Sequence, residues 1–373
     1  MTDPKLDPKG LWLGRVDIDG VGPAVVTLRD GALFDITSRA GPTVRDILEM
    51  GDPAAYVRSA AGERLSDPAT LPKGVRWLAP CDLQAVKAAG VTFAGSMVER
   101  VIEEKAAGDP TRADEIRKRI GDRIGASLSS IVPGSEAAEA AKRALQAEGL
   151  WSQYLEVGIG PDAEVFTKSQ VLASVGHSAA VGLHPKSHWN NPEPEVVLAV
   201  NSRGEIHGAT LGNDLNLRDF EGRSALLLSK AKDNNASGAI GPMIRLFDAT
   251  FRLDSIRNIV LDLRVVGEDG FVLTGQSSMA EISRDPADIV RQTVGRHHQY
   301  PDGFVLFLGT LFAPTLDRDT PGQGFTHKLG DQVTISCAEL GTLANTVRLS
   351  TECPEWTFGT AALMRNLAGR GLL

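Results

Sequence analysis

The pattern of apolar and polar residues divides this chain into a short strand-rich start, a helical middle and a long strand-rich remainder. Residues 10–38 read as three short strands between glycine-rich turns, and Thr43 is placed to cap a helix that runs to Glu49. Residues 51–75 are rich in turn-forming residues. We therefore expect a small N-terminal β domain over residues 1–78, ending in a linker.

A helical periodicity follows over residues 97–150, with breaks near Gly108 and Pro133. From residue 151 onward, short apolar runs bounded by turns dominate. They predict strands at 155–159, 163–167, 194–200, 205–211, 258–266, 270–275, 304–309 and 332–337, and a helix from Asp285 to about His297. Many strands with few helices favour a β-rich α+β domain over a parallel sheet of βαβ units.

Composition narrows the class of protein. The 373 residues are 42% hydrophobic and carry a formal net charge of −8 with a pI near 5.5, which is typical of a soluble globular chain. No block of lysine and arginine stands out, so we expect neither nucleic acid nor a membrane as a partner. The first residues lack the apolar core of a signal peptide, and the three cysteines form no CxxC pair. These features favour a cytoplasmic protein without disulfides.

One apolar run begins with two acidic residues. Glu193 and Glu195 are two positions apart, so in a strand both side chains project from the same face. Like charges on one face repel, and a divalent cation, which prefers oxygen ligands, would offset that repulsion. Asp214 follows one hairpin return later and would supply a third carboxylate. The alternative is that both glutamates lie on a solvated strand face; the apolar residues 196–200 argue for burial, and both readings stay open.

Residues on either side of this run suit an anionic, hydroxylated ligand. Arg218 and Lys232 are close in sequence to the acidic residues and would bring positive charge to the site. Ser187 and Asn191 precede Glu193, and a hydroxyl and an amide beside a metal site suit sugar hydroxyls. Ordinary turn chemistry explains Ser187 and Asn191 equally well.

Several runs resemble the fumarylacetoacetate hydrolase superfamily. They are PEPEVVLAV, GNDLNLRD and AIGP, followed by the Gly309-Thr310 turn, a Gly-Asp strand entry and a late Gly-to-Asn strand. The resemblance covers about residues 80–373. It implies an α+β, β-rich fold: a fumarylacetoacetate-hydrolase-type β-roll C-terminal domain over 79–373, with a helical insertion at about 97–150 and the small N-terminal β domain.

The resemblance also implies a cofactor and an assembly. Superfamily members chelate Mg2+ with an ExE pair and a later aspartate, which correspond here to Glu193, Glu195 and Asp214, with Mn2+ or Ca2+ as substitutes. A homodimer or homotetramer is implied as well. Within the superfamily, the runs SHWNNPEPEVVL, HHQYPDGFVLFLGTLFAP and DRDTPGQGFTHK are most similar to bacterial 2-keto-3-deoxy-D-xylonate (D-pentonate) dehydratases.

That narrower likeness implies a reaction. The ligand would be a 2-keto-3-deoxy sugar acid, dehydrated to 2,5-dioxopentanoate through a metal-stabilised enolate in non-phosphorylating pentose catabolism. The hydrolases and decarboxylases of the superfamily carry G-x-N-Y-x-x-H-x-x-E, whereas the stretch from Gly90 to Glu99 has Ser96 in the histidine position. A hydrolase needs a base to activate water, so the loss of the imidazole favours elimination.

Other functions remain as alternatives. They are an acylpyruvate or β-diketone hydrolase, a keto-acid decarboxylase or isomerase, and a catalytically silent protein that binds keto acids. We expect Glu99 to move protons, with Ser96 orienting it, although Glu99 also suits the dipole of a helix N-terminus. Lys232 is the rival acid or base, because a metal and Arg218 would lower its pKa, and it is also a candidate Schiff base. The expected substrate-binding residues are Arg218, Thr310, Gly309, Ser187, Asn191 and Lys168, the last matching a lysine of the superfamily.

Overall fold

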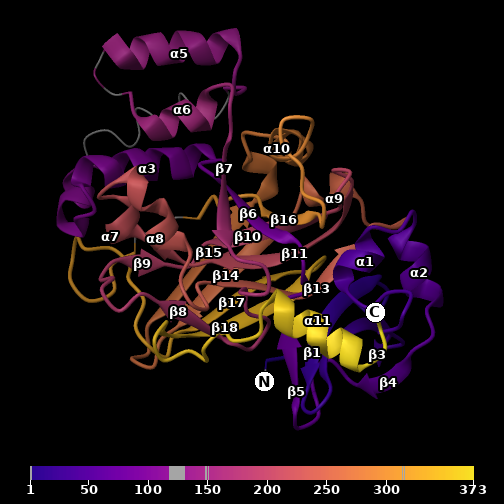
Figure 1. Cartoon of the computed structure of the whole chain (residues 1–373). Helices are drawn as coiled ribbons and strands as arrows, with labels where there is room; N and C mark the ends of the chain where they lie inside the picture. The colour runs from indigo at the N-terminus through magenta and orange to yellow at the C-terminus, as the bar shows by residue number, and fades with distance from the viewer. Residues whose placement is uncertain (1, 117–130, 148, 150, 313, 315) are drawn as a thin grey trace.

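Two β-sheets stacked on each other form the body of the protein, and helices cover its ends (Figure 1). The computed structural model describes residues 2–116, 131–147, 149, 151–312, 314 and 316–373. Within these ranges, no helix is both long and apolar enough to cross a bilayer.

The larger sheet has eleven strands and joins the N-terminal strands to those that follow residue 160. Its order is β4 (Glu63–Ser66), β3 (Ala32–Asp35), β2 (Gly22–Arg29), β1 (Trp12–Ile18), β13 (Gly238–Leu246), β11 (Ile206–Asp214), β10 (Pro194–Val200), β16 (Phe304–Phe307), β6 (Ala85–Gly90) and β7 (Glu164–Ser169). A further strand, β5 (Val75–Leu78), pairs with β1. Because β1 pairs directly with β13, the sheet is continuous across residue 78. The domain boundary placed there stays a prediction.

The smaller sheet has five strands and one open face. Its order is β15 (Val272–Ser278), β14 (Val260–Val266), β17 (Gln332–Cys337), β18 (Gly341–Leu349) and β8 (Ala180–Leu183). Buried and exposed residues alternate along β14, as in a strand with one solvated face. A separate pair, β9 (Asn190–Asn191) and β12 (Asn216–Leu217), lies beside the larger sheet.

Ten α-helices have both ends within the described part of the chain, and residues 110–116 are helical as well. The ten are α1 (Val44–Leu48), α2 (Pro53–Ser59), α3 (Ala94–Ala106), α5 (Glu136–Ala147), α6 (Gln153–Ile159), α7 (Arg218–Glu221), α8 (Leu228–Lys232), α9 (Leu253–Ile256), α10 (Pro286–Thr293) and α11 (Thr360–Gly369). Helices α3, α5 and α6 form a layer at one end of the body (Figure 1). C-terminal α11 returns to the N-terminal strands, where Asn366 donates to the carbonyl of Val21 at 2.7 Å.

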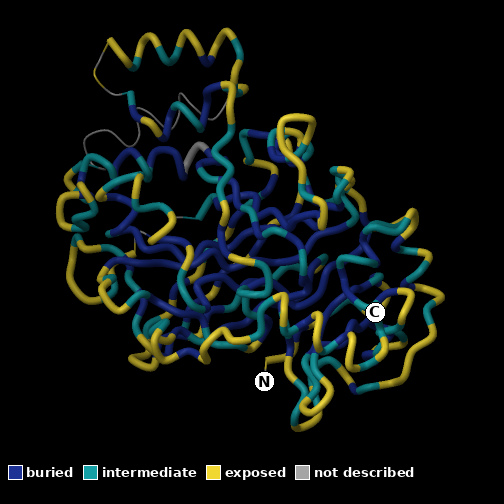
Figure 2. Tube along the Cα trace, viewed as in Figure 1, coloured by how far each residue is buried: buried dark blue, intermediate teal, exposed yellow. Residues whose placement is uncertain are grey.

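The main core fills the space between the two sheets. Val196, Leu198 and Val200 of β10 point into it and meet apolar residues such as Leu263 and Ile335 of the smaller sheet. The intervening residues of β10 are buried in clusters on its other face. Strand β10 is therefore covered on both sides, as its uninterrupted apolar sequence predicts, and Figure 2 shows the deepest burial along these central strands.

The predicted α+β, β-rich fold is confirmed, with two errors of detail. The strand expected at 155–159 is part of helix α6, in which Leu155 and Ile159 pack one turn apart into the helical layer and Ser152 caps the first turn. The turn-rich stretch after residue 51 contains α2, which begins with an Asp52 cap and a proline in its first turn. The other predicted strands correspond to β7, β10, β11, β14, β15, β16 and β17.

Candidate metal centre and active site

Three carboxylates meet where β10 begins and β11 ends. The two strands are antiparallel, with Glu195 opposite Gly212, and the backbone N–H of Asp214 donates to the carbonyl of Glu193 at 3.0 Å. Glu193 and Glu195 share one face, as their spacing predicts, and one oxygen from each of the three side chains lies within 4.8 Å of the others. All three residues are buried. The solvated strand face, which was the alternative, is wrong.

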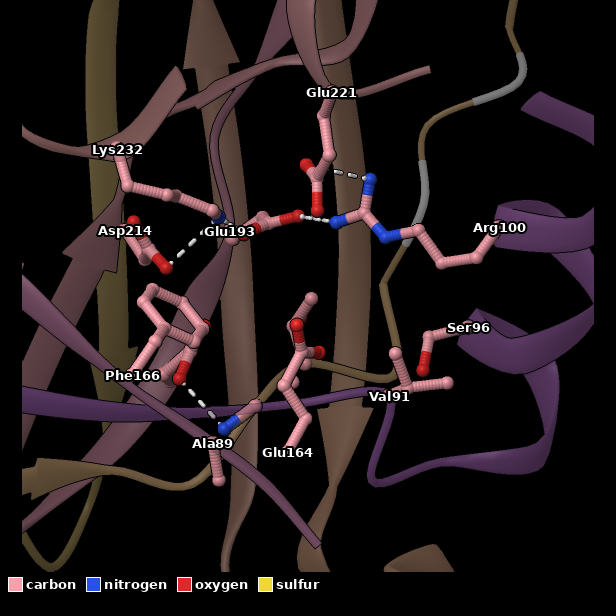
Figure 3. A pocket seen from close by; sticks show the side chains of 14 residues that line it. Ala89, Val91, Ser96, Arg100, Glu164, Phe166, Glu193, Asp214, Glu221 and Lys232 are labelled. Atoms are coloured by element: carbon pink, nitrogen blue, oxygen red, sulfur yellow. Dashed lines mark hydrogen bonds and ion pairs between the residues drawn. The ribbon is translucent and has the colours of Figure 1, made fainter. Parts of the chain in front are cut away.

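Two lysines lie against these carboxylates. The Nζ atom of Lys232, on α8, is 2.7 Å from Glu193 and 2.9 Å from Asp214, as Figure 3 shows. Lys168 of β7 approaches Asp214 from the other side at 3.0 Å. Burial alone would raise the pKa of Asp214, but these two cations lower it.

The carboxylates around Lys232 shift its pKa upward, and the lowering expected beside a bound metal ion and Arg218 stays a prediction. Burial does lower the pKa of its ammonium, but the negative charges of Asp214 and Glu193 outweigh burial and raise it. Lys232 is therefore an ammonium ion here, and an ammonium is a poor nucleophile for Schiff-base formation.

Glu195 is held by the turn after β16. The backbone N–H of Gly309 donates to its carboxylate at 2.6 Å. Gly309 has a φ of +87°, and a Cβ there would lie 2.1 Å from the hydroxyl oxygen of Thr92, so the turn requires glycine. Burial, followed by the charges of Asp214 and Glu193, raises the pKa of Glu195 well above its usual range.

Helix α3 brings a second group of polar side chains to the site. Ser96, Arg100 and Glu103 recur at helical spacing and therefore share one face. The Arg100 guanidinium lies 2.6 Å from Glu193, 2.7 Å from Glu103 and 3.1 Å from Glu221. Figure 3 shows Arg100 between Glu193 and Glu221. Arg100 thus links the helix to a carboxylate of the proposed metal centre.

Two further carboxyl groups border the cavity. Burial raises the pKa of Glu221, on α7, to about 7. Glu164 of β7 points into the same cavity (Figure 3), and burial raises its pKa as well. Its carboxyl lies over Gly90, its partner in β6, where a Cβ would come within 1.9 Å of it. A glycine at position 90 is what leaves room for Glu164.

The cavity has two neighbouring compartments with shared walls. The first is bordered by the three carboxylates and Lys232 together with Ala89, Gly90, Val91, Ser96, Arg100, Glu164, Phe166, Glu221, Gly309 and Thr310. The second is bordered by Glu99, Glu103, Asn191, Asn216, Arg218 and Phe312, and it shares Ser96, Arg100, Glu193 and Thr310 with the first. A ligand can therefore extend from one compartment into the other.

Arg218 faces the second compartment, but its charge is already paired. Its Nε donates to Glu103 at 2.7 Å and its Nη2 to Glu99 at 3.3 Å, while the guanidinium stacks on Trp189 at 4.2 Å. Arg218 therefore orients Glu99.

Ser96 makes a separate contact, in which its hydroxyl donates to the carbonyl of Phe93 at 2.9 Å.

The charge balance of the cavity fits a divalent cation. Seven buried or half-buried carboxylates face four cations here: Glu99, Glu103, Glu164, Glu193, Glu195, Asp214 and Glu221 against Arg100, Lys168, Arg218 and Lys232. Arg100, Lys168 and Lys232 pair with Glu193 and Asp214, and the oxygen atoms of Glu193, Glu195 and Asp214 are the kind of donor that Mg2+ prefers. These three residues are the ones that would hold the ion.

The structure gathers most of the predicted site residues. Neither compartment is bordered by Ser187, whose hydroxyl donates to Asp219 at 2.8 Å, or by Lys168, which acts on the site through Asp214. Sequence reasoning missed Arg100, Glu103, Glu164, Asn216 and Glu221. The i, i+4, i+7 spacing from Ser96 would have indicated the first two.

Comparison with known proteins agrees with the resemblance seen in the sequence. Residues 171–348 match the family model described as fumarylacetoacetate (FAA) hydrolase C-terminal. The 2-dehydro-3-deoxy-D-arabinonate dehydratase of Saccharolobus solfataricus is 28% identical over 185 residues, which are 50% of this chain and 58% of that protein. The probable 2-keto-3-deoxyxylonate dehydratase of Haloferax volcanii is 27% identical over 266 residues, 64% of this chain and 87% of that protein.

Solved structures share the fold. A 2-keto-3-deoxy-D-arabinonate dehydratase complexed with magnesium and 2,5-dioxopentanoate aligns with a TM-score of 0.64 at 21% identity, over 91% of this chain and 99% of its own. A fumarylacetoacetate hydrolase from Exiguobacterium antarcticum aligns with a TM-score of 0.56 at 18% identity, over the same shares. Because both reactions occur on this fold, the fold alone does not select between them.

The matched segment contains Glu193, Glu195 and Asp214, the residues that the structure brings together. The fold around them is the one seen in the solved dehydratase and hydrolase. Residues 171–348 of this chain therefore match the fumarylacetoacetate (FAA) hydrolase C-terminal family, and the structure has the fold of the solved proteins compared above.

Proposed function

We propose that this protein is a Mg2+-dependent lyase that dehydrates 2-keto-3-deoxy-D-xylonate to 2,5-dioxopentanoate. The observation that carries the proposal is the buried cluster of Glu193, Glu195 and Asp214, beside a helix that has Ser96 where a hydrolase would have its histidine. Both curated relatives reported above bear the names of 2-keto-3-deoxy-pentonate dehydratases. Their names support this substrate class.

The chain's own groups suit each proton transfer. A Mg2+ ion held by Glu193, Glu195 and Asp214 would supply Lewis-acid polarisation of the ketone of a 2-keto acid. Glu99 takes a proton from C3 and returns it to the C4 hydroxyl, which leaves as water when the C4–O bond breaks. A proton then moves from C5 to C3, which leaves a C4=C5 enol, and the hydroxyl proton of that enol moves to C4 to give the C5 aldehyde. Arg218, 3.3 Å from Glu99, holds that carboxylate in place.

Other residues position the ligand and exclude water. The Gly309-Thr310 turn borders both compartments and offers Thr310 to the substrate carboxylate. The Ser96 hydroxyl donates its hydrogen bond to the backbone carbonyl of Phe93 and therefore does not activate water. None of the described residues that border the two compartments is a histidine, which supports elimination over hydrolysis. The homodimer or homotetramer and the cytoplasmic location stay predictions.

The direct test measures aldehyde formation from 2-keto-3-deoxy-D-xylonate with Mg2+, with and without EDTA, beside an acylpyruvate. We expect metal-dependent production of 2,5-dioxopentanoate and an intact acylpyruvate. Borohydride should trap no adduct, since Lys232 is paired with two carboxylates. Acylpyruvate cleavage without dehydration would replace this proposal with the hydrolase alternative.

A further inference from the structure

Two buried asparagines of the second compartment have unused hydrogen-bonding capacity. Asn191 of β9 and Asn216 of β12 are direct cross-strand partners, and both border this compartment. They are 2% and 1% exposed. Among the residues that the structure describes, neither Oδ1 atom has a hydrogen-bond partner.

Unpaired buried carbonyl oxygens are costly. Leaving one without a donor costs about 1–3 kcal/mol, so two adjacent ones in the lining of a cavity indicate that a ligand supplies the donors. The Asn191 carboxamide is also fixed in orientation, because its Nδ2 donates to the carbonyl of Pro192 at 2.9 Å. The Oδ1 atom of Asn191 therefore faces the compartment as a hydrogen-bond acceptor, and hydroxyl groups of a ligand can donate to it.

The two compartments differ in the chemistry they offer. The first contains the carboxylates that would hold a divalent cation, together with Lys232, and so suits the keto-acid end of a ligand. The second contains two amide oxygens and the apolar ring of Phe312, and so suits the hydroxyls and C–H groups of a carbon chain. Glu99 belongs to the second compartment, where a ligand's third and fourth carbons would follow its keto-acid head.

We propose that Asn191 and Asn216 form a subsite whose two amide oxygens share the one hydrogen bond that the terminal hydroxyl of a 2-keto acid donates when the head of that acid lies in the first compartment. The proposal rests on the proposed function for the placement of that head. It makes the asparagine pair the element that selects hydroxylated over plain aliphatic 2-keto acids, since an aliphatic chain would leave both oxygens unpaired.

The test uses two ligands that lack a C4 hydroxyl and therefore cannot be dehydrated. The dissociation constants of 5-hydroxy-2-oxopentanoate and 2-oxopentanoate are measured calorimetrically with Mg2+ for the wild type and for Asn216→Leu and Asn191→Leu. We expect the wild type to bind the hydroxylated acid about tenfold more tightly, the equivalent of roughly 1.4 kcal/mol. Each substitution should bring this ratio close to one while the affinity for 2-oxopentanoate changes little.

A matched control is available three positions away. Asn213 is fully buried and its carboxamide also lacks partners among the described residues, but it borders neither compartment. Asn213→Leu should leave the ratio unchanged. A wild-type ratio near one, or a ratio that survives both Asn216→Leu and Asn191→Leu, would overturn the subsite. Hydroxyl selectivity without dehydration of 2-keto-3-deoxy-D-xylonate would instead keep the subsite and reject the proposed reaction.

Discussion

The two sides of the cavity are held in place by different means. The strand side carries Glu193, Glu195 and Asp214 at the ends of β10 and β11, two strands inside an eleven-stranded sheet. The helix side carries its polar groups on α3, which packs through a separate apolar cluster that includes Val101 and Ile102. Ion pairs from Arg100 and Glu103 connect the two sides.

The two sides therefore have different proposed roles: the strand side would bind the metal ion, and the helix side would carry the groups that transfer protons. Backbone register fixes the distances among the strand carboxylates, so the proposed cation centre depends on the sheet. The placement of α3 depends on its apolar packing, and ion pairs orient its polar side chains, so the groups that would move protons depend on electrostatics as well. Substitutions on the strand side should therefore affect metal binding and chemistry together, whereas those on the helix side should affect chemistry more than the fold.

The largest effect is expected from Asp214→Asn. The change removes the third carboxylate and leaves Lys168 and Lys232 less well paired. If the lost interaction is worth about 4 kcal/mol, kcat should fall about 1000-fold, and Mg2+ binding measured by calorimetry should weaken. Asp262→Asn on the solvated face of β14 is the control and should change neither quantity. Undiminished Mg2+ binding in Asp214→Asn would remove Asp214 from the metal centre.

A smaller effect is expected from Arg100→Met. Glu193, Glu103 and Glu221 lose their shared guanidinium. Partners that orient metal-binding groups are typically worth 10- to 100-fold, so kcat/KM for 2-keto-3-deoxy-D-xylonate should fall within roughly that range. Circular dichroism should show an unchanged fold. Arg143→Met, on the exposed face of α5, supplies the matched control. Wild-type kinetics in Arg100→Met would mean that the two sides act independently.

The smallest effect concerns the pH dependence of stability. Burial raises the pKa of Glu221 from 4.5 to about 7. Between these values the unfolded chain has released the proton that the folded chain keeps, so the free energy of unfolding should fall as pH rises through about 7. Urea denaturation in EDTA between about pH 5 and pH 8 should show this fall reduced in Glu221→Gln. Glu355→Gln, at an exposed position, should retain the wild-type slope, and equal slopes in both variants would contradict the assignment.

The strand side could be predicted from sequence because its signals are local. A spacing of two places Glu193 and Glu195 on one face, and the apolar run that follows indicates a buried strand. Strand β11 continues through Gly212 and Asn213 to Asp214, three residues beyond the predicted end at residue 211. Each inference needed only a few neighbouring residues and the geometry of a hairpin.

The helix side could not be predicted to the same depth, because its partners are distant in sequence. Arg100 meets Glu193 across 93 positions, a pairing that exists once α3 has docked on the sheet. The direction of the Lys232 pKa shift likewise depends on its 2.9 Å separation from Asp214. The strand wrongly expected at 155–159 shows the related difficulty that a short apolar run fits a helix as well as a strand.

The pairing of β1 with β13 has a consequence for synthesis on the ribosome. Trp12 and Leu13 are aligned with Arg245 and Ile244, so this end of β1 emerges long before the strand that covers it, whereas β5 pairs with residues 15–18. At about 5–20 residues per second, that wait lasts roughly 10–45 seconds. Throughout this interval the first strands must survive as a partly open sheet, and such edges are the surfaces on which nascent chains associate. Chaperone dependence of the newly made protein should therefore be concentrated in its first 80 residues, far from the chemistry.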